Sequence, residues 1–200
     1  MIKNVVFDLG NVLLTFKPME YLKSKLNDDK LAEKIYNIIF KSDEWIMLDN
    51  GVIKTEEATE KFCMRMRNKE NIIKDVMNDW HNLLKPIDEN IQILNDLKEK
   101  GYKIYILSNF HDIAFDNVYK KYDFFKDADG IVISAKIKCI KPEKEMFENL
   151  INTYKIKYEE SIFIDDVKEN VDMASSLGMD TIHLEDYKKL KEKLNLKGFL

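Results

Sequence analysis

The sequence predicts an α/β protein: a parallel sheet with helices on both faces, a Rossmann-like core, and a small all-helical cap inserted after the first strand. After residue 86, short apolar runs alternate with amphipathic segments, and parallel neighbours in a sheet need such helical crossovers. Between residues 15 and 86 only helical periodicity occurs. We therefore expect an α/β core of residues 1–14 and 87–200 and a helical cap of residues 15–86. A chain of 200 residues is long enough for one domain with an insertion.

The first expected strand covers residues 2–7, an apolar run that stops at Asp8. Apolar residues then recur at helical spacing from about residue 18 to residue 84. Asp28 and Thr55 are candidate helix caps, and Asn50-Gly51 is expected to break the pattern. The segment from Trp45 to Gly51 is our candidate for a substrate-facing loop, with packing inside the cap as the alternative.

The remaining elements alternate regularly. We expect a helix that Asp88 caps and Gly101 ends, and a later helix with Pro142 in its first turn. In order, the expected elements are a helix from 88, a strand over 102–107, a helix over 113–122, a strand over 130–134, a helix after 142, a strand over 161–164, a helix closed at 178, a strand over 181–184 and a Lys-rich terminal helix.

Composition excludes several kinds of partner. The chain is 45% hydrophobic and 34% charged with a net charge of −4, and it has no basic block for nucleic acid. No apolar stretch approaches the roughly 18 to 20 residues that cross a bilayer. The start lacks the features of a signal peptide, so we expect a cytoplasmic protein. Cys63 and Cys139 are far apart and form no metal-binding or disulfide motif, which indicates structural roles.

Polar residues follow several of the predicted strands. Asp8, Ser108 and the pair Asp165-Asp166 come at strand ends, and Lys141 precedes a helix. In open parallel sheets, ligands bind outside the carboxyl ends of the strands, so these side chains should converge on one crevice. Three neighbouring carboxylates repel one another and need a cation, and their hard oxygen atoms suit Mg²⁺. A hydroxyl, an ammonium and free N–H groups beside that ion would bind a phosphoryl group.

These residues fall into four ordered motifs: Phe7-Asp-Leu-Gly-Asn-Val-Leu-Leu14, Leu107-Ser-Asn109, Lys141-Pro142 and Ile164-Asp-Asp-Val-Lys-Glu-Asn170. Together they resemble the haloacid dehalogenase-like hydrolase superfamily. The resemblance covers nearly the whole chain, because a helical cap between the first two motifs is also a family pattern. Each motif alone is weak evidence, but four in order at the right element boundaries are specific.

The resemblance implies a role for each matching residue. Asp8 would be the nucleophile that forms an aspartyl-phosphate intermediate, and Mg²⁺ would bridge its carboxylate and the phosphoryl group. The Gly10 carbonyl and Asp166 would also bind the metal, with Asp165 in direct or water-mediated contact. Asn170 would steady this acidic loop. Ser108 and Lys141 would act with Asp8 in catalysis, and the phosphoryl group would contact Asp8, Leu9, Gly10, Ser108, Asn109 and Lys141.

One position departs from the family pattern. Most phosphatases of the superfamily carry a second Asp two residues after the nucleophile, which protonates the leaving group, and here that position is Gly10. His111 is a candidate substitute for proton transfer, with a surface or helix-capping role as the alternative. The Asp-Leu-Gly-Asn-Val pattern itself resembles a sugar-phosphate phosphatase subgroup that includes glucose-1-phosphate phosphatases. The missing acid therefore does not imply an inactive enzyme.

The resemblance thus predicts a Mg²⁺-dependent phosphomonoester hydrolase for a small phosphorylated metabolite, with a sugar phosphate as one candidate. The alternative is a catalytically weak module that binds a phosphorylated ligand or a protein and has lost the general acid at Gly10. The acid pair at 165 and 166 argues against a metal-free dehalogenase. Gly10 argues against a phosphomutase. The sequence identifies no protein partner.

Overall fold

Five parallel strands form the centre of the molecule. The computed structural model describes residues 1–200, and the strand order is β3-β2-β1-β4-β5 with every neighbouring pair parallel. The strands are β1 (Asn4–Phe7), β2 (Lys103–Ser108), β3 (Gly130–Ile133), β4 (Ser161–Asp165) and β5 (Asp180–His183). This confirms the predicted fold class, and it places β1, which leads into Asp8, in the middle of the sheet.

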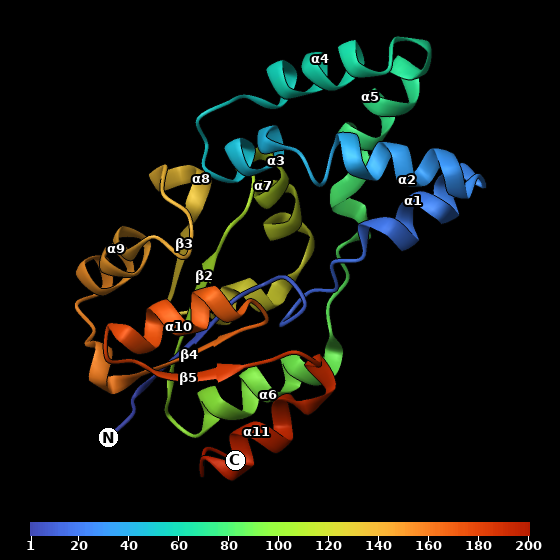
Figure 1. Cartoon of the computed structure of the whole chain (residues 1–200). Coiled ribbons are helices and arrows are strands. Elements are labelled where there is room, and N and C mark those ends of the chain that lie inside the picture. The colour runs from blue at the N-terminus through green and yellow to red at the C-terminus, as the bar shows by residue number, and fades with distance from the viewer.

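Helices cover both faces of the sheet (Figure 1). They are α6 (Asp88–Glu99), α7 (Asp112–Lys121), α8 (Ser134–Ile137), α9 (Lys144–Tyr154), α10 (Lys168–Ser176) and α11 (Leu190–Leu196). Successive residues of a strand point to opposite faces. Val5 and Phe7 accordingly join the core cluster that includes side chains of α6, α7 and α11. Val6 joins the second cluster, with side chains of α9 and α10.

Five helices lie between β1 and α6, in the segment that we propose as the cap. They are α1 (Pro18–Leu26), α2 (Asp29–Ile38), α3 (Asp43–Asp49), α4 (Thr55–Arg65) and α5 (Glu70–Asp79), and they lie above the carboxyl ends of the strands in Figure 1. Short 3₁₀ turns occur at Arg67–Lys69, Trp80–Leu83, Asp123–Asp127, Tyr158–Glu160 and Tyr187–Lys189. None of the helices in the chain has the length and apolar character needed to cross a membrane.

The two connections between cap and core run side by side. The Thr15 N–H donates to the Lys85 carbonyl at 2.8 Å, and the Ile87 N–H donates to the Leu13 carbonyl at 2.9 Å. These bonds fix the point where the chain leaves the core and returns to it. Residues 15–86 therefore remain the segment that we propose as the cap.

A second contact holds α3 against the core. Gly51 has φ of +65°, and a Cβ built there would lie 2.2 Å from the Ala135 carbonyl oxygen. The Ser134 hydroxyl donates to the Asp49 carbonyl and accepts a bond from the Phe110 N–H at 2.9 Å. The close approach requires glycine, and it fixes the end of α3 relative to the sheet.

Four expected helix starts can be compared with the structure. Asp28 caps α2 by accepting a bond from the Leu31 N–H at 3.0 Å, as predicted. Thr55 and Asp88 are the first residues of their helices and not the caps, so those two predictions were wrong by one residue. Pro142 is also not in the first turn of α9, which begins two residues later. The Asn109 side chain bonds both main-chain groups of Lys141, at 2.8 and 3.0 Å, and so holds this segment in a turn at the end of β2.

Candidate active site

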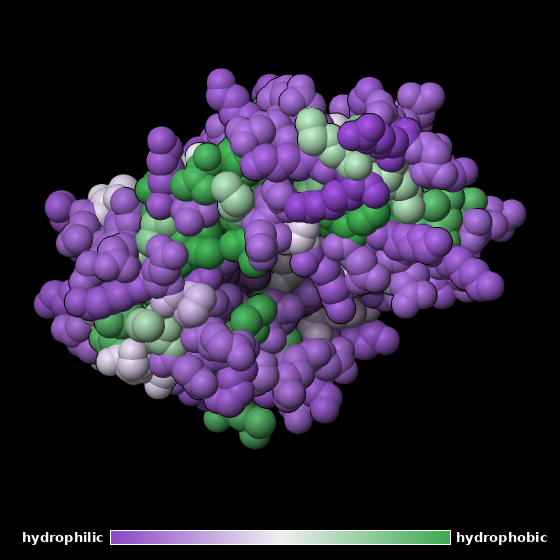
Figure 2. All heavy atoms as spheres, turned by 45° about the horizontal axis from the view of Figure 1, so that its top comes forward, coloured by the Kyte–Doolittle hydropathy of each residue, from purple (hydrophilic) through white to green (hydrophobic).

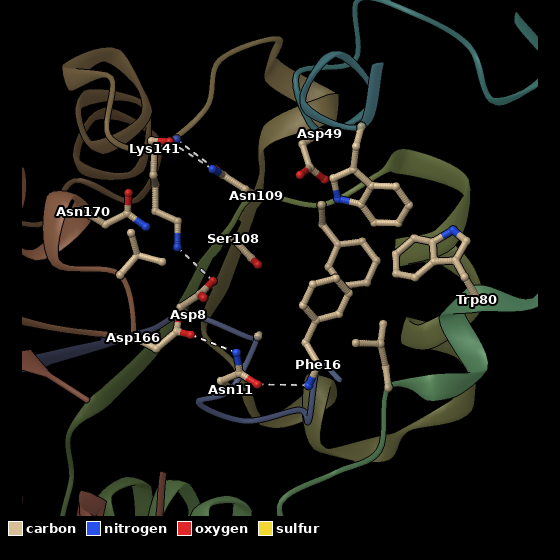
Figure 3. A pocket seen from close by; sticks show the side chains of 15 residues that line it. Asp8, Asn11, Phe16, Asp49, Trp80, Ser108, Asn109, Lys141, Asp166 and Asn170 are labelled. Atoms are coloured by element: carbon tan, nitrogen blue, oxygen red, sulfur yellow. Dashed lines mark hydrogen bonds and ion pairs between the residues drawn. The ribbon is translucent and has the colours of Figure 1, made fainter. Parts of the chain in front are cut away.

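The predicted site residues meet at the carboxyl edge of the sheet. Asp8 follows β1, Ser108 ends β2, Asp165 ends β4, and Lys141 lies in the turn before α9. They adjoin a cavity of about 200 Å³ (Figure 3), and its lining includes seven predicted residues, Asp8, Gly10, Ser108, Asn109, Lys141, Asp166 and Asn170. A hollow opens near the middle of the face shown in Figure 2, which is otherwise mostly polar.

Lys141 is the centre of the polar network. Its side chain is 1% exposed, and its Nζ lies 2.8 Å from Asp8 Oδ1 and 2.6 Å from Asp165 Oδ2. Burial alone would lower the pKa of Lys141, but the carboxylates of Asp165 and Asp8 raise it overall. Lys141 therefore remains a charged ammonium beside the Asp8 carboxylate.

Both carboxylate oxygens of Asp165 are hydrogen-bonded within the protein. Its side chain has no exposed surface, and besides Lys141 it accepts bonds from the Val167 N–H at 2.8 Å and from Asn170 Nδ2, 3.1 Å from each oxygen. Asn170 thus steadies the acidic loop in the way the resemblance implied. With both oxygens engaged, Asp165 is suited to positioning Lys141.

The Asp166 carboxylate has fewer hydrogen-bond partners than the Asp165 carboxylate. Its Oδ2 accepts a bond from Asn11 Nδ2 at 2.9 Å, and Asn11 in turn accepts from the Phe16 N–H at 3.1 Å. Asn11 has φ of +51°, a conformation that Asn tolerates better than most residues. Sequence analysis missed Asn11, although it belongs to the first motif. Burial raises the pKa of Asp166, and the Asn11 bond opposes that rise.

Negative charge exceeds positive charge in this cluster. Oxygen atoms of Asp8, Asp165 and Asp166 lie within 4.8 Å of one another, and the Lys141 ammonium contacts two of these acids, Asp8 and Asp165. Burial raises the pKa of Asp8, Lys141 opposes that rise, and the charges of Asp165 and Asp166 add to it. A compact set of hard oxygen donors with excess negative charge fits a divalent cation such as Mg²⁺.

Several hydrogen-bond donors in the segments that follow β1 and β2 have no partner in the protein. The main-chain N–H groups of Leu9, Gly10 and Asn109 donate to no acceptor in the protein, and the Ser108 hydroxyl is likewise unbonded while it faces the pocket. Together with Lys141 they form a set of donors suited to phosphoryl oxygen atoms.

The opposite wall of the pocket is apolar and comes largely from the cap. It consists of Phe16, Trp45, Trp80, Leu84 and Phe110. The ring centroids of Trp45 and Trp80 are 4.8 Å apart, and those of Phe16 and Trp45 are 6.4 Å apart. Apart from Trp45, which begins the segment expected to face the substrate, sequence analysis assigned these residues no site role, because aromatic residues at helical spacing are usually part of a core.

Asp49 is the further site residue that sequence analysis did not single out. It ends α3 and lines the pocket, and Figure 3 shows it across the pocket from Asp8 and Asp166. The segment from Trp45 to Gly51 is therefore mainly a helix and not the expected loop, although Trp45 and Asp49 do line the pocket. Burial raises the pKa of Asp49 to about 8, and the charge of Asp8 adds to the effect.

His111 lies behind Asp49 and does not line the pocket. It is 3% exposed, and its Nε2 is 3.3 Å from Asp49 Oδ1, but the angle is not that of a hydrogen bond and Nε2 has no partner. Burial lowers the pKa of His111 to about 3, so the imidazole is neutral at physiological pH. The residue precedes α7 without a side-chain capping bond.

Comparison with known proteins identifies the family. Residues 6–184 match the model of the haloacid dehalogenase-like hydrolases, and the chain belongs to this family of α/β enzymes. It is similar to a solved enzyme of the family from Bacteroides thetaiotaomicron in complex with magnesium and inorganic phosphate, with a TM-score of 0.72, 26% identity, and coverage of 91% of this chain and 93% of that one.

Two curated relatives are phosphatases. The sesquiterpene phosphatase of Aspergillus oryzae is 27% identical over 189 residues, which cover 92% of this chain and 90% of the relative. The D-ribitol-5-phosphate phosphatase of Bacteroides thetaiotaomicron is 23% identical over 211 residues, 98% of each chain. The L-2-haloacid dehalogenase of Xanthobacter autotrophicus, at 17% identity and a TM-score of 0.68, shares the fold.

Proposed function

We propose that this protein is a Mg²⁺-dependent phosphomonoester hydrolase that acts through an aspartyl-phosphate on Asp8. The observation that carries the proposal is the buried pair of contacts from Lys141 to Asp8 and Asp165, at 2.8 and 2.6 Å, beside free main-chain donors. Phosphatase relatives, and a related structure that contains magnesium and phosphate, support it.

The residues present fit the metal. Asp8, Asp166 and the Gly10 carbonyl, which accepts no hydrogen bond in the protein, would hold Mg²⁺, while Asp165 is already saturated. When bound, the ion would offset the negative charge of the nucleophile and the phosphoryl oxygens.

The side chains of the core supply the remaining chemistry. Asp8 attacks the phosphorus atom, because its carboxylate faces the pocket while one oxygen is held by Lys141. Lys141, the Ser108 hydroxyl and the Asn109 N–H bind phosphoryl oxygen atoms whose charge shifts in the transition state. Attack of water on the aspartyl-phosphate then releases inorganic phosphate and restores Asp8.

Two classes of leaving group are candidates. The first-motif resemblance favours a sugar phosphate, and the D-ribitol-5-phosphate phosphatase agrees with that class. The aromatic wall favours a second candidate, a phosphate ester with an apolar leaving group, and the sesquiterpene phosphatase is a relative of that kind. Both candidates are small phosphorylated compounds, which the cavity size also favours.

A panel of phosphate esters tests the proposal. We expect phosphate release from sugar, isoprenoid and aryl phosphates with Mg²⁺, loss of activity with a chelator, and full activity in the exposed control variant Asp123→Asn. Equal rates with and without chelator would refute metal dependence. Phosphate binding without turnover of any ester would support the alternative of a binding module that lost its general acid.

A further inference from the structure

Asp49 is the acid of the pocket that comes from the cap and not from the core. Three acids line the pocket, Asp8, Asp49 and Asp166. Asp8 is bonded to Lys141 and Asp166 to Asn11, and both come from the core. Asp49 comes from the cap, on the side of the aromatic wall (Figure 3). In the function proposed above, the leaving group of a phosphate ester attacked by Asp8 would lie on that side.

The environment of Asp49 favours a carboxyl that holds a proton. His111 Nε2 lies 3.3 Å from Asp49 Oδ1, is buried and has no hydrogen-bond partner. The imidazole is enclosed by the rings of Trp45 and Trp80, with centroid distances of 4.2 and 5.0 Å. Burial raises the pKa of Asp49 to about 8, which agrees with a protonated group at neutral pH. The neutral His111 ring therefore lies beside the Asp49 carboxyl without a hydrogen bond to it.

The main chain holds Asp49 in place. The Ser134 hydroxyl bonds the Asp49 carbonyl, and Gly51 packs directly on Ala135. The carboxyl therefore belongs to a segment anchored on the core, although its residue is part of the cap. A group that transfers a proton needs such fixed geometry, because the transfer requires hydrogen-bond distance.

Position 10, where most family phosphatases carry the acid, is open. A Cβ built on Gly10 would meet only Asp8 Oδ2, at 3.9 Å, and Gly10 does not have the positive φ that excludes side chains. A Cβ at position 10 therefore meets neither a steric clash nor an unfavourable backbone angle.

We propose that Asp49 is the general acid and base of the reaction, a role that rests on the function proposed above. When Asp8 attacks, the new bond joins its carboxylate oxygen to phosphorus, the bond from phosphorus to the leaving oxygen breaks, and that oxygen takes the Asp49 proton. The Asp49 carboxylate then accepts a proton from the water that attacks the aspartyl-phosphate. Inorganic phosphate, a free Asp8 carboxylate and a protonated Asp49 result.

Leaving-group dependence in Asp49→Asn tests this role. An alkoxide needs a proton to leave, whereas 4-nitrophenolate needs little help. With Mg²⁺ present, we expect kcat for an alkyl phosphate to fall by about 10² to 10⁴ and kcat for 4-nitrophenyl phosphate to fall less than about tenfold. Asp43→Asn, an exposed change in the same helix, should leave both rates unchanged.

A second variant separates proton transfer from structural damage. Adding Gly10→Asp to Asp49→Asn should restore alkyl phosphate turnover at least tenfold, because it places an acid where most family phosphatases carry one and a Cβ there meets no clash. Equal loss on both substrates, or no change in their ratio, would overturn the role of Asp49. If the wild-type protein hydrolyses no ester, or Asp8→Asn remains active, the function proposed above fails instead.

Discussion

The two halves of the pocket are built in different ways. The core half is polar, and its charged side chains are linked: Lys141 joins Asp8 to Asp165, and Asn170 bonds Asp165. The cap half is an aromatic wall with Asp49 as its acid. In the mechanism that we propose, the core half binds and transfers the phosphoryl group, while the cap half binds the leaving group and protonates it.

Asp8→Asn should cause the largest loss of activity among the changes in the core half. The amide is nearly the same size as the carboxylate but is a poor nucleophile, so we expect kcat to fall by about 10⁴ or more on every ester. The fold should persist, because Lys141 keeps its bond to Asp165. Steady-state rates and a melting curve measure both effects, and appreciable turnover by a folded variant would exclude covalent catalysis by Asp8.

Lys141→Met should affect both rate and stability. Loss of the ammonium removes charge stabilisation in the transition state, at a cost of about 10² to 10³ in kcat. It also leaves the buried Asp8 and Asp165 without their cation, and breaking a buried ion pair costs about 3–5 kcal/mol. Denaturant unfolding at pH 7 measures the second effect, and Lys144→Met, an exposed lysine nearby, is the control. An unchanged rate would remove Lys141 from the reaction.

Metal binding should distinguish the two acids at the end of β4. We expect Mg²⁺ to raise the melting temperature, since a ligand at 100 times its Kd adds about 2.7 kcal/mol of stability. Asp166→Asn should abolish that rise, because Asp166 has a free oxygen. Asp165→Asn should instead lower stability without metal, because it weakens the Lys141 bond. A normal metal response in Asp166→Asn would contradict our assignment.

Most of the core half could be predicted from sequence, because its residues follow strands. A strand end fixes where Asp8, Ser108 and Asp165 must lie once the sheet is parallel, and the motif pattern added Lys141 and Asn170. Strand limits differed by only one or two residues from expectation, for example at β2. In a parallel sheet, a residue that follows a strand lies at the carboxyl edge of the sheet, so its place in the sequence predicts its place in the structure.

The cap half could not be predicted in the same way. Helical periodicity shows which residues turn inward but not which neighbour they meet, so Trp80 resembled an ordinary core residue. Asp49, an acid at the end of a helix, gave no signal of burial. His111 was singled out by its position after Ser108, yet its side chain points to Asp49 and away from the pocket lining. These placements depend on how the cap packs on the core.

The smallest expected effect concerns the stability of the Asp49→Asn variant at different pH values. Folding raises the pKa of Asp49 from 3.8 to about 8, chiefly through burial. The folded state therefore holds this proton more tightly than the unfolded state, and the associated stability is complete below pH 4 and is lost as the pH rises through 8.

Asn has no proton to lose, so the variant should gain stability relative to wild type between pH 5 and 9. Because the Asp49 side chain is 21% exposed, we expect a gain on the order of 1 kcal/mol, or about 2–4 °C in Tm. Asp8 has the same sign of shift but is present in both proteins, so the difference between their melting curves isolates Asp49. A difference that does not change with pH would show that Asp49 ionises near its ordinary value.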